Sequence, residues 1–295
     1  MATKTPRLVV CGGSGFLGSR ICKSAVSRGW TVTSVSRTGE PDWSAAFGSP
    51  TPPEWSGKVT WAKANLLFPS TYKECLKDAT AVVHSMGILL ETDYKGVLSG
   101  KENPITGICR AFNSVKGTSR NPLKEGNSPG EPQLTYETIN RDSGKYSNPT
   151  ITLVEESVAT APETLTSFVY ISAADGSIVL PGRYISTKRE AEAAITALST
   201  SKKPFRPILL RPGFLYDTTR SATMPLAGLM GITSAVNSLF GGKLPLLGVA
   251  GYKPLKVEVV AEAAVEAIAN ESVKGVVEVK DIEELYSKAW RRDML

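Results

Sequence analysis

A phenol and an ammonium group lie four residues apart in the segment YISTK, where Tyr184 is followed by Lys188. On a helix this spacing puts both side chains on one face, and Ala191 and Ile195 continue that face toward a core. A nearby ammonium stabilises the phenolate, so the tyrosine comes closer to acting as an acid or base near neutral pH. Twelve residues before the tyrosine, Ser172 ends the run VYIS and can hydrogen-bond a carbonyl oxygen. Together the three polar side chains predict proton transfer at a carbonyl or alcohol.

A second candidate site is the segment VVCGGSGFLGSRI, which has the spacing GxxGxxG at Gly12, Gly15 and Gly18. Glycines at this spacing let the backbone turn tightly after a strand, approach a pyrophosphate and pack the next helix closely. The N-terminus of that helix then faces the anion. This pattern predicts a dinucleotide site built from Gly12, Gly13, Ser14, Gly15, Phe16, Leu17 and Gly18.

The end of the second expected strand bears on which dinucleotide binds. An NAD site usually has Asp or Glu about twenty residues after the glycines, where it binds the ribose hydroxyls. This chain instead has Ser36 and Arg37, and an arginine suits a 2′-phosphate. We therefore expect NADP(H) as the preferred cofactor. NAD(H) stays an alternative, because Arg37 could be a solvated turn residue and Glu40 or Asp42 could turn toward the ribose.

Apolar runs typical of buried strands alternate with helical spacings along the chain. We expect strands at Leu8 to Cys11, Trp30 to Val35, Val59 to Ala62, Ala81 to His84, Thr166 to Ile171 and Arg206 to Leu210. We expect helices at Phe16 to Arg28, Ser70 to Lys77 and Val257 to Ala269. This alternation predicts an α/β fold, a Rossmann-type doubly wound parallel sheet.

Two regions interrupt the alternation and suggest the domain organisation. A dinucleotide-binding domain is expected over residues 1–215, with a Gly-, Ser-, Asn- and Pro-rich insertion at about 87–135. A small C-terminal lobe for substrate or partner is expected over 216–295. Within it, Ser221 to Gly242 is uncharged and long enough for a membrane span, but its proline, glycines and polar residues favour a pocket wall or interfacial segment.

The composition argues against several classes of protein. The formal charge is +6, but the basic residues are scattered, so no nucleic-acid partner is expected. Arg291 and Arg292 beside Trp290 are either a solvated tail or a contact for acidic lipid. The four cysteines lack metal-binding spacing, which predicts a reducing compartment and no metal site. The seven residues before the first expected strand show no cleavable presequence, so either import is signalled otherwise or this sequence lacks the presequence.

Two further polar residues have alternative interpretations. His84, the only histidine, ends an expected strand, where it is either a buried structural residue or a proton donor. Arg211 follows another expected strand, and it either clamps an anionic substrate or caps the edge of the sheet.

The glycine segment GGSGFLG, a strand ending in Ser172 and the YxxxK spacing together resemble the extended and atypical branches of the short-chain dehydrogenase/reductase superfamily, over roughly Leu8 to Gly213. The resemblance implies Tyr184 as acid/base, Lys188 as its electrostatic partner and ribose ligand, and Ser172 as carbonyl orienter. It also implies a structural and proton-relay role for Asn140. Further implied cofactor contacts are Asn65, Leu66, Ser85, Met86, Gly87, Pro212 and Gly213.

Two positions depart from the pattern of that superfamily. Extended members often carry Asp after the third strand, where this chain has Asn65, whose carbonyl can still accept a hydrogen bond from adenine. The usual small apolar residues after the fourth strand are replaced by HSMG, from His84 to Gly87.

The N-terminal segment, VTSVSRTG and the tail after LRPGFLYD resemble a fungal mitochondrial family attached to the coenzyme Q biosynthetic complex. That family is related to the NAD(P)H-binding accessory subunit of respiratory complex I. The resemblance implies a matrix location with inner-membrane association, proteins of the coenzyme Q complex as partners, and a role in ubiquinone synthesis or its regulation.

Three functions are consistent with these features. The first is hydride transfer between NADP(H) and a prenylated quinone precursor, with Met224 to Phe240 walling a pocket for a lipophilic substrate. The second is a non-catalytic NAD(P)H-binding accessory or regulatory subunit, because a fold does not establish chemistry. The third, an epimerase or dehydratase acting on a nucleotide sugar, is disfavoured because the C-terminal lobe is poor in Arg and Asn for diphosphate contacts.

Overall fold

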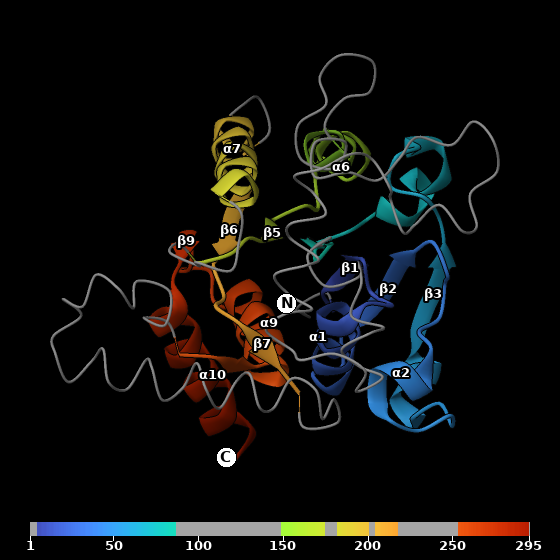
Figure 1. Cartoon of the computed structure of the whole chain (residues 1–295). Coiled ribbons are helices and arrows are strands. Elements are labelled where there is room, and N and C mark those ends of the chain that lie inside the picture. The colour runs from blue at the N-terminus through green and yellow to red at the C-terminus, as the bar shows by residue number, and fades with distance from the viewer. Residues whose placement is uncertain (1–4, 87–148, 175–181, 201–203, 218–252, 295) are drawn as a thin grey trace, which may run out of the picture.

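The computed structural model describes residues 5–86, 149–174, 182–200, 204–217 and 253–294. Within these residues, seven parallel strands form one sheet in the order β3-β2-β1-β4-β5-β6-β9 (Figure 1). The strands are β1 (Arg7–Cys11), β2 (Thr31–Ser36), β3 (Val59–Lys63), β4 (Ala81–His84), β5 (Ser167–Ile171), β6 (Arg206–Leu210) and β9 (Gly275–Val277). The predicted Rossmann-type parallel sheet is confirmed. The strand order reverses between β1 and β4, where ligands of this architecture bind.

Helices cover both faces of the sheet (Figure 1). One face carries α1 (Phe16–Ser27), α9 (Val257–Ala269) and α10 (Val279–Asp293), and the other carries α6 (Pro149–Thr160) and α7 (Gly182–Ser199). The short helix α2 (Trp43–Phe47) and the turn η1 (Glu54–Lys58) lie between β2 and β3. A separate parallel pair joins β7 (Leu215–Tyr216) to β8 (Leu255–Lys256).

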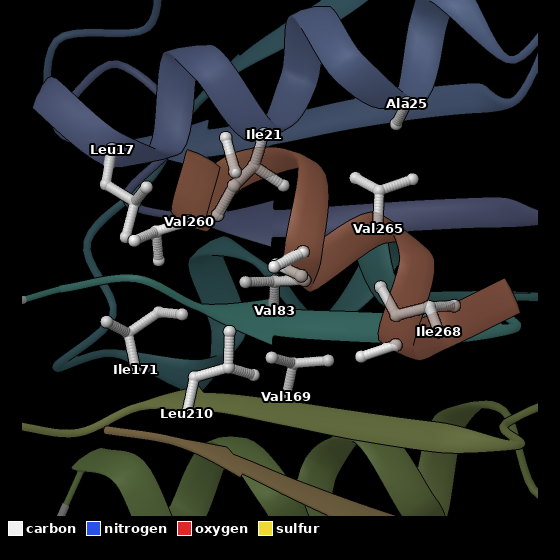
Figure 2. Close-up of a cluster of buried hydrophobic side chains, with 14 of the residues drawn as sticks. Leu17, Ile21, Ala25, Val83, Val169, Ile171, Leu210, Val260, Val265 and Ile268 are labelled. Carbon is white, nitrogen blue, oxygen red and sulfur yellow. The ribbon is translucent and has the colours of Figure 1, made fainter. Parts of the chain in front are cut away.

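Alternating apolar residues divide the core into two layers. In β1, Leu8 and Val10 pack with α1 and α9, whereas Val9 and Cys11 pack with α6 and α7. Successive strand side chains point to opposite faces, so a strand covered on both faces is apolar throughout. Figure 2 shows the first layer, where Ile21 of α1 and Val260 of α9 lie above the strands.

One predicted helix is wrong. The segment Ser70 to Lys77 forms two short 3-10 turns, η2 (Pro69–Thr71) and η3 (Lys73–Leu76). The hydroxyl of Thr71 donates a 2.7 Å hydrogen bond to the main-chain oxygen of Phe68, which competes with regular helical bonding. Tyr72 separates the turns at φ −124°, and its side chain is fully buried. Burial of this ring anchors a compact turn in place of a helix.

The C-terminal part of the chain contributes to the main sheet. Strand β9 pairs with β6, and α9 packs its apolar face into the same core as α1. Strand β9 has no counterpart among the expected strands, because a strand of three residues is too short for a periodic pattern. The residues Trp290 to Arg292, considered as a tail, belong to α10, and Arg292 pairs with Glu266 at 2.6 Å.

Several predictions concern residues outside the described ranges. These are the insertion at about 87–135, the stretch Ser221 to Gly242 with its proposed pocket wall Met224 to Phe240, and most of the C-terminal lobe's first half. The division into domains at residue 215 stays a prediction. Among the described residues, no helix combines the length and apolarity needed to cross a membrane.

Candidate active site

The predicted phosphate loop connects β1 to α1 at the point where the strand order reverses. Gly12 adopts φ +88°, a conformation that favours glycine, and its N–H donates a 2.8 Å hydrogen bond to the oxygen of Val35. The N–H of Gly15 then closes the turn on the oxygen of Gly12 at 3.0 Å. The N-cap of α1 is Gly15, which makes no side-chain capping hydrogen bond, and a helix N-terminus of this kind favours an anion.

Two glycines of the loop are required by close approach of the backbone. A Cβ atom at Gly18 would lie 2.2 Å from the oxygen of Gly12, and one at Gly13 would lie 2.3 Å from Ser34 Oγ. Real Cβ atoms do not come this close, so both positions require glycine. The loop thus has the tight turn and close helix packing that the glycine spacing predicts, and its contact with a nucleotide diphosphate stays a prediction.

The loop after β2 is fixed to the phosphate loop. Thr38 Oγ1 lies 3.0 Å from Ser14 Oγ, and this hydrogen bond links the two segments. The hydroxyl of Ser36 donates to the oxygen of Gly39 and accepts from its N–H, so it shapes the turn itself. Arg37 is exposed beside this turn.

The ends of β3 and β4 complete the predicted nucleotide-binding edge. Asn65 Oδ1 accepts a 3.1 Å hydrogen bond from the N–H of Leu67, which leaves one lone pair for another donor. The side chain of Leu66 is buried. Ser85 Oγ donates to the oxygen of Cys11 at 2.9 Å, and Met86 approaches Gly12 so closely that a Cβ there would lie 3.0 Å from its Cγ.

Lys188 is buried where α7 crosses the end of β5, with 2% of its surface exposed. Its Nζ donates a 3.0 Å hydrogen bond to the oxygen of Ile171 and lies 4.6 Å from the ring centroid of Tyr170. Burial lowers the pKa of this amine to about 7, and the carboxylate of Glu192 acts in the opposite direction. The amine is therefore poised to exchange a proton near neutral pH.

Ser172 lies directly after β5 and is held on both sides. Its N–H donates a 2.7 Å hydrogen bond to the oxygen of Leu210 in β6, and its Oγ accepts a 3.1 Å hydrogen bond from Arg189 Nη1. Main-chain pairing with β6 fixes the turn, and the N–H of Ala174 extends it by donating to the oxygen of Pro212. Pro212 is thereby placed beside the serine, with Gly213 following it.

Arg211 is part of an ion-pair network at the sheet edge. Its Nη2 lies 2.5 Å from Glu192 and its Nη1 lies 2.8 Å from Glu278. Hydrogen bonding to Glu192 raises the pKa of the guanidinium. Of the two interpretations left open by the sequence, these contacts favour a cap on the sheet edge.

His84 is buried under the same edge. Its Nε2 lies 3.5 Å from Thr150 Oγ1, and its Nδ1 has no hydrogen-bond partner among the described residues. Burial lowers its pKa to about 3, and the positive charge of Lys188 acts in the same direction. A neutral, buried histidine fits the structural interpretation.

Some of the predicted site residues lie at one edge of the sheet, and others are not among the residues that the structure describes. The phosphate loop, the ends of β2, β3 and β4, Ser172 and Lys188 lie along the carboxyl edge of one sheet. Tyr184 lies in the first turn of α7, one turn before Lys188, but the described atoms do not include its side chain. Asn140 and Gly87 lie outside the described residues. The functional roles of all these residues stay predictions.

Sequence reasoning missed Arg189 and Glu192, which follow Lys188 in the segment KREAE. Glu192 is almost fully buried, although the helical spacing alone would place it beside the apolar face rather than in it. The only signal in the sequence for these buried charges is that charged residues flank Ala191, at the border of the apolar face of the helix.

The strand order, the glycine turn at its reversal and the lysine beside the end of β5 define a Rossmann-type fold of the kind found in extended short-chain dehydrogenases/reductases. The chain belongs to the family of MIOREX complex component 2 of Saccharomyces cerevisiae, with 36% identity over 288 residues, 94% of this chain and 98% of the yeast protein. No family model matches the chain.

Solved structures agree on the fold. Vestitone reductase from alfalfa superposes with a TM-score of 0.53 at 16% identity, over 92% of this chain and 76% of that enzyme. UDP-glucuronic acid 4-epimerase from Bacillus cereus, solved in complex with NAD, gives a TM-score of 0.53 at 14% identity, over 92% of this chain and 77% of the epimerase. At these identities the similarity establishes the fold alone.

Proposed function

We propose that this protein is an NAD(P)H-dependent oxidoreductase that acts in, or regulates, mitochondrial ubiquinone biosynthesis. The observation that carries the proposal is the convergence of the glycine turn, Ser172 and Lys188 at one edge of the sheet. A nicotinamide dinucleotide bound there supplies or accepts a hydride. The sequence resemblance to the coenzyme Q-associated family supports the pathway, a matrix location at the inner membrane and partners from that complex.

Each predicted site residue named below has a defined task in this proposal. Gly12 to Gly18 hold the diphosphate through main-chain N–H groups. Arg37 binds the 2′-phosphate, which makes NADP(H) the preferred cofactor. Tyr184 exchanges a proton with the substrate oxygen, Ser172 orients that oxygen, and Lys188 tunes the phenol and binds the nicotinamide ribose. The substrate is a lipophilic, quinone-related carbonyl or alcohol.

The decisive experiment separates binding from chemistry. The Tyr184→Phe protein is compared with wild type for NADPH binding, by fluorescence titration, and for ubiquinone production in cells that lack the endogenous protein. We expect unchanged binding and a loss of ubiquinone. The matched control is Tyr286→Phe, which changes a half-buried tyrosine on α10. Wild-type ubiquinone production by the Tyr184→Phe protein would exclude catalysis through the phenol.

A non-catalytic NAD(P)H-binding subunit is the second candidate, and one observation favours it. Ser172 and Lys188 are both hydrogen-bonded within the chain, to Arg189 and to Ile171. A bound nucleotide would then stabilise the fold by mass action and organise a complex without turnover. Mass spectrometry of small molecules that co-purify distinguishes the two, because a retained nucleotide together with a prenylated aromatic compound supports the oxidoreductase.

A further inference from the structure

Four charged side chains connect β5, α7, β6 and α10 beneath the predicted catalytic serine. Arg189 Nη1 lies 2.5 Å from Glu192 Oε1, and Arg211 reaches the same carboxylate through Nε at 3.0 Å and Nη2 at 2.5 Å. The other end of Arg211 binds Glu278, the N-cap of α10. The chain of contacts runs from β5 through α7 and β6 to α10, and its charges balance.

Arg189 contacts two consecutive residues at the end of β5. Its Nη1 donates to Ser172 Oγ at 3.1 Å, and its Nη2 donates to the main-chain oxygen of Ala173 at 2.8 Å. A guanidinium has donors only, so the serine oxygen must be the acceptor. The hydroxyl proton of Ser172 is thereby left to point toward another acceptor.

The charge on Arg189 also affects how strongly that proton is donated. A hydroxyl that accepts a hydrogen bond from a cation is polarised and becomes a better donor. Ser172 is 4% exposed, so the interaction is weakly screened by water. The planar guanidinium is held in turn by Glu192, which limits its freedom to leave the serine.

We propose that Arg189 is a positioning residue that fixes the Ser172 hydroxyl as a hydrogen-bond donor toward the carbonyl oxygen of the substrate. This inference rests on the proposed function for its substrate. The contact between the guanidinium and the atom at position 172 is testable without any turnover, so the two can fail separately.

The test replaces the serine by a titratable group. In the Ser172→Cys protein, thiolate absorbance at 240 nm is followed across a pH series. The wild-type absorbance is subtracted, and the difference gives the pKa of the introduced thiol. The same measurement is made on the Ser172→Cys/Arg189→Met protein. We expect removal of the cation to raise the thiol pKa by at least about one pH unit, since a neighbouring arginine stabilises a thiolate. The Ser172→Cys/Arg189→Lys protein should have a thiol pKa between the other two, because lysine keeps the positive charge but lacks the paired donors of the guanidinium.

A matched control removes a different partly buried arginine. Arg28 also binds two carboxylates, Glu262 and Glu266, but it lies after α1, away from the serine. The Ser172→Cys/Arg28→Met protein should keep the thiol pKa of the Ser172→Cys protein. Equal thiol pKa values with and without Arg189 would overturn the proposal. A shift of the thiol pKa in the Arg28→Met control as large as that caused by Arg189→Met would also overturn it.

A kinetic comparison tests the same assignment during turnover. NADPH oxidation by decylubiquinone is followed for wild type, Ser172→Ala, Arg189→Met and the double variant. If Arg189 acts through Ser172, each single variant lowers kcat on the order of tenfold to a hundredfold and the double variant is no slower than Ser172→Ala. Additive losses would contradict the proposal. A wild-type protein that consumes no NADPH would instead contradict the proposed function, while the thiol titration still decides the role of Arg189.

Discussion

Lys188 Nζ donates a 3.0 Å hydrogen bond to the main-chain oxygen of Ile171, so α7 is fastened to the last residue of β5. The contact buries an amine at the carboxyl edge of the sheet, one turn after Tyr184 along the helix. Because burial holds the lysine pKa at about 7, the protonation state of this edge changes within the physiological range.

Replacement of Lys188 by methionine should change how stability depends on pH. The lysine pKa is about 7 in the folded chain and near its ordinary value of 10.5 in the unfolded chain. Between these values the unfolded chain binds more protons, so the contribution of this residue to the unfolding free energy rises with pH. Lys188→Met lacks this rise, and its stability relative to wild type should fall by a few kcal/mol, on the order of 1.4 per pH unit, across this window. Urea unfolding at several pH values measures the difference, and parallel pH profiles would contradict it.

His84 should make the wild-type protein sensitive to mild acid. Its pKa is about 3 when folded, against an ordinary value of 6.5, so below pH 6.5 the unfolded chain binds the extra proton. Stability is therefore lost as pH falls through this window. Between about pH 6.5 and 5, before most carboxylates titrate, we expect a loss of roughly 1–2 kcal/mol in wild type and almost none in His84→Leu. Because the chain has one histidine, a slope that persists in the variant would rule out this assignment.

Gly18→Ala should abolish nucleotide binding and destabilise the fold. The new Cβ would meet the oxygen of Gly12 at 2.2 Å, which would push α1 away from β1. We expect a cost of about 1–3 kcal/mol in unfolding free energy. Gly57→Ala is the matched control, since a Cβ there meets no atom within 4 Å, and it should change stability by less than about 0.5 kcal/mol. Fluorescence titration with NADPH and thermal unfolding check both variants; NADPH binding retained by Gly18→Ala would refute the phosphate-loop assignment.

Arg37→Ser should shift the cofactor preference. Loss of a charge-assisted contact to the 2′-phosphate should raise the dissociation constant for NADPH by about tenfold or more, which corresponds to ~1.4 kcal/mol. The dissociation constant for NADH should stay within about twofold, because NADH has no 2′-phosphate. Lys23→Ser removes an exposed charge from α1 and serves as the control. Equal weakening of both nucleotides by Arg37→Ser would argue for a solvated turn residue.

Asp217→Ala should be strongly destabilising, because it removes the buried carboxylate of Arg20 and leaves only the longer contact with the half-exposed Glu258 at 3.9 Å. Arg20 and Asp217 form an ion pair in which both side chains are almost fully buried, and Arg20 also donates to Ala46 and stacks 4.2 Å from the ring centroid of Phe47. We expect a loss of about 3–5 kcal/mol.

The control for this ion pair is an exposed one. Glu283→Ala, which breaks the pair with Lys253 on the surface, should cost less than about 1 kcal/mol. The double variant Arg20→Met/Asp217→Ala should lose less than the sum of its single variants in chemical denaturation. Strict additivity would show that the two side chains are not coupled.

Local patterns in the sequence were sufficient for most of the sheet. All six expected strands match the structure within one residue at each end, and Val257 to Ala269 coincides with α9. These elements are long enough for their apolar spacing to determine which side chains are buried. The turn around Tyr72 was mispredicted because burial of one ring and the Thr71 hydroxyl outweighed helical spacing.

In the candidate site, too, some features follow from the local sequence and others only from the tertiary structure. The sequence by itself determined the glycine turn, whose geometry depends on residues adjacent in the chain, and the spacing that puts Tyr184 and Lys188 one turn apart on α7. Only the tertiary structure decided that Arg189 binds Ser172, that Arg211 binds Glu192, and that Arg20 meets Asp217, 197 residues away. Such pairs depend on which strands and helices lie side by side in the folded chain, and no local spacing encodes that arrangement.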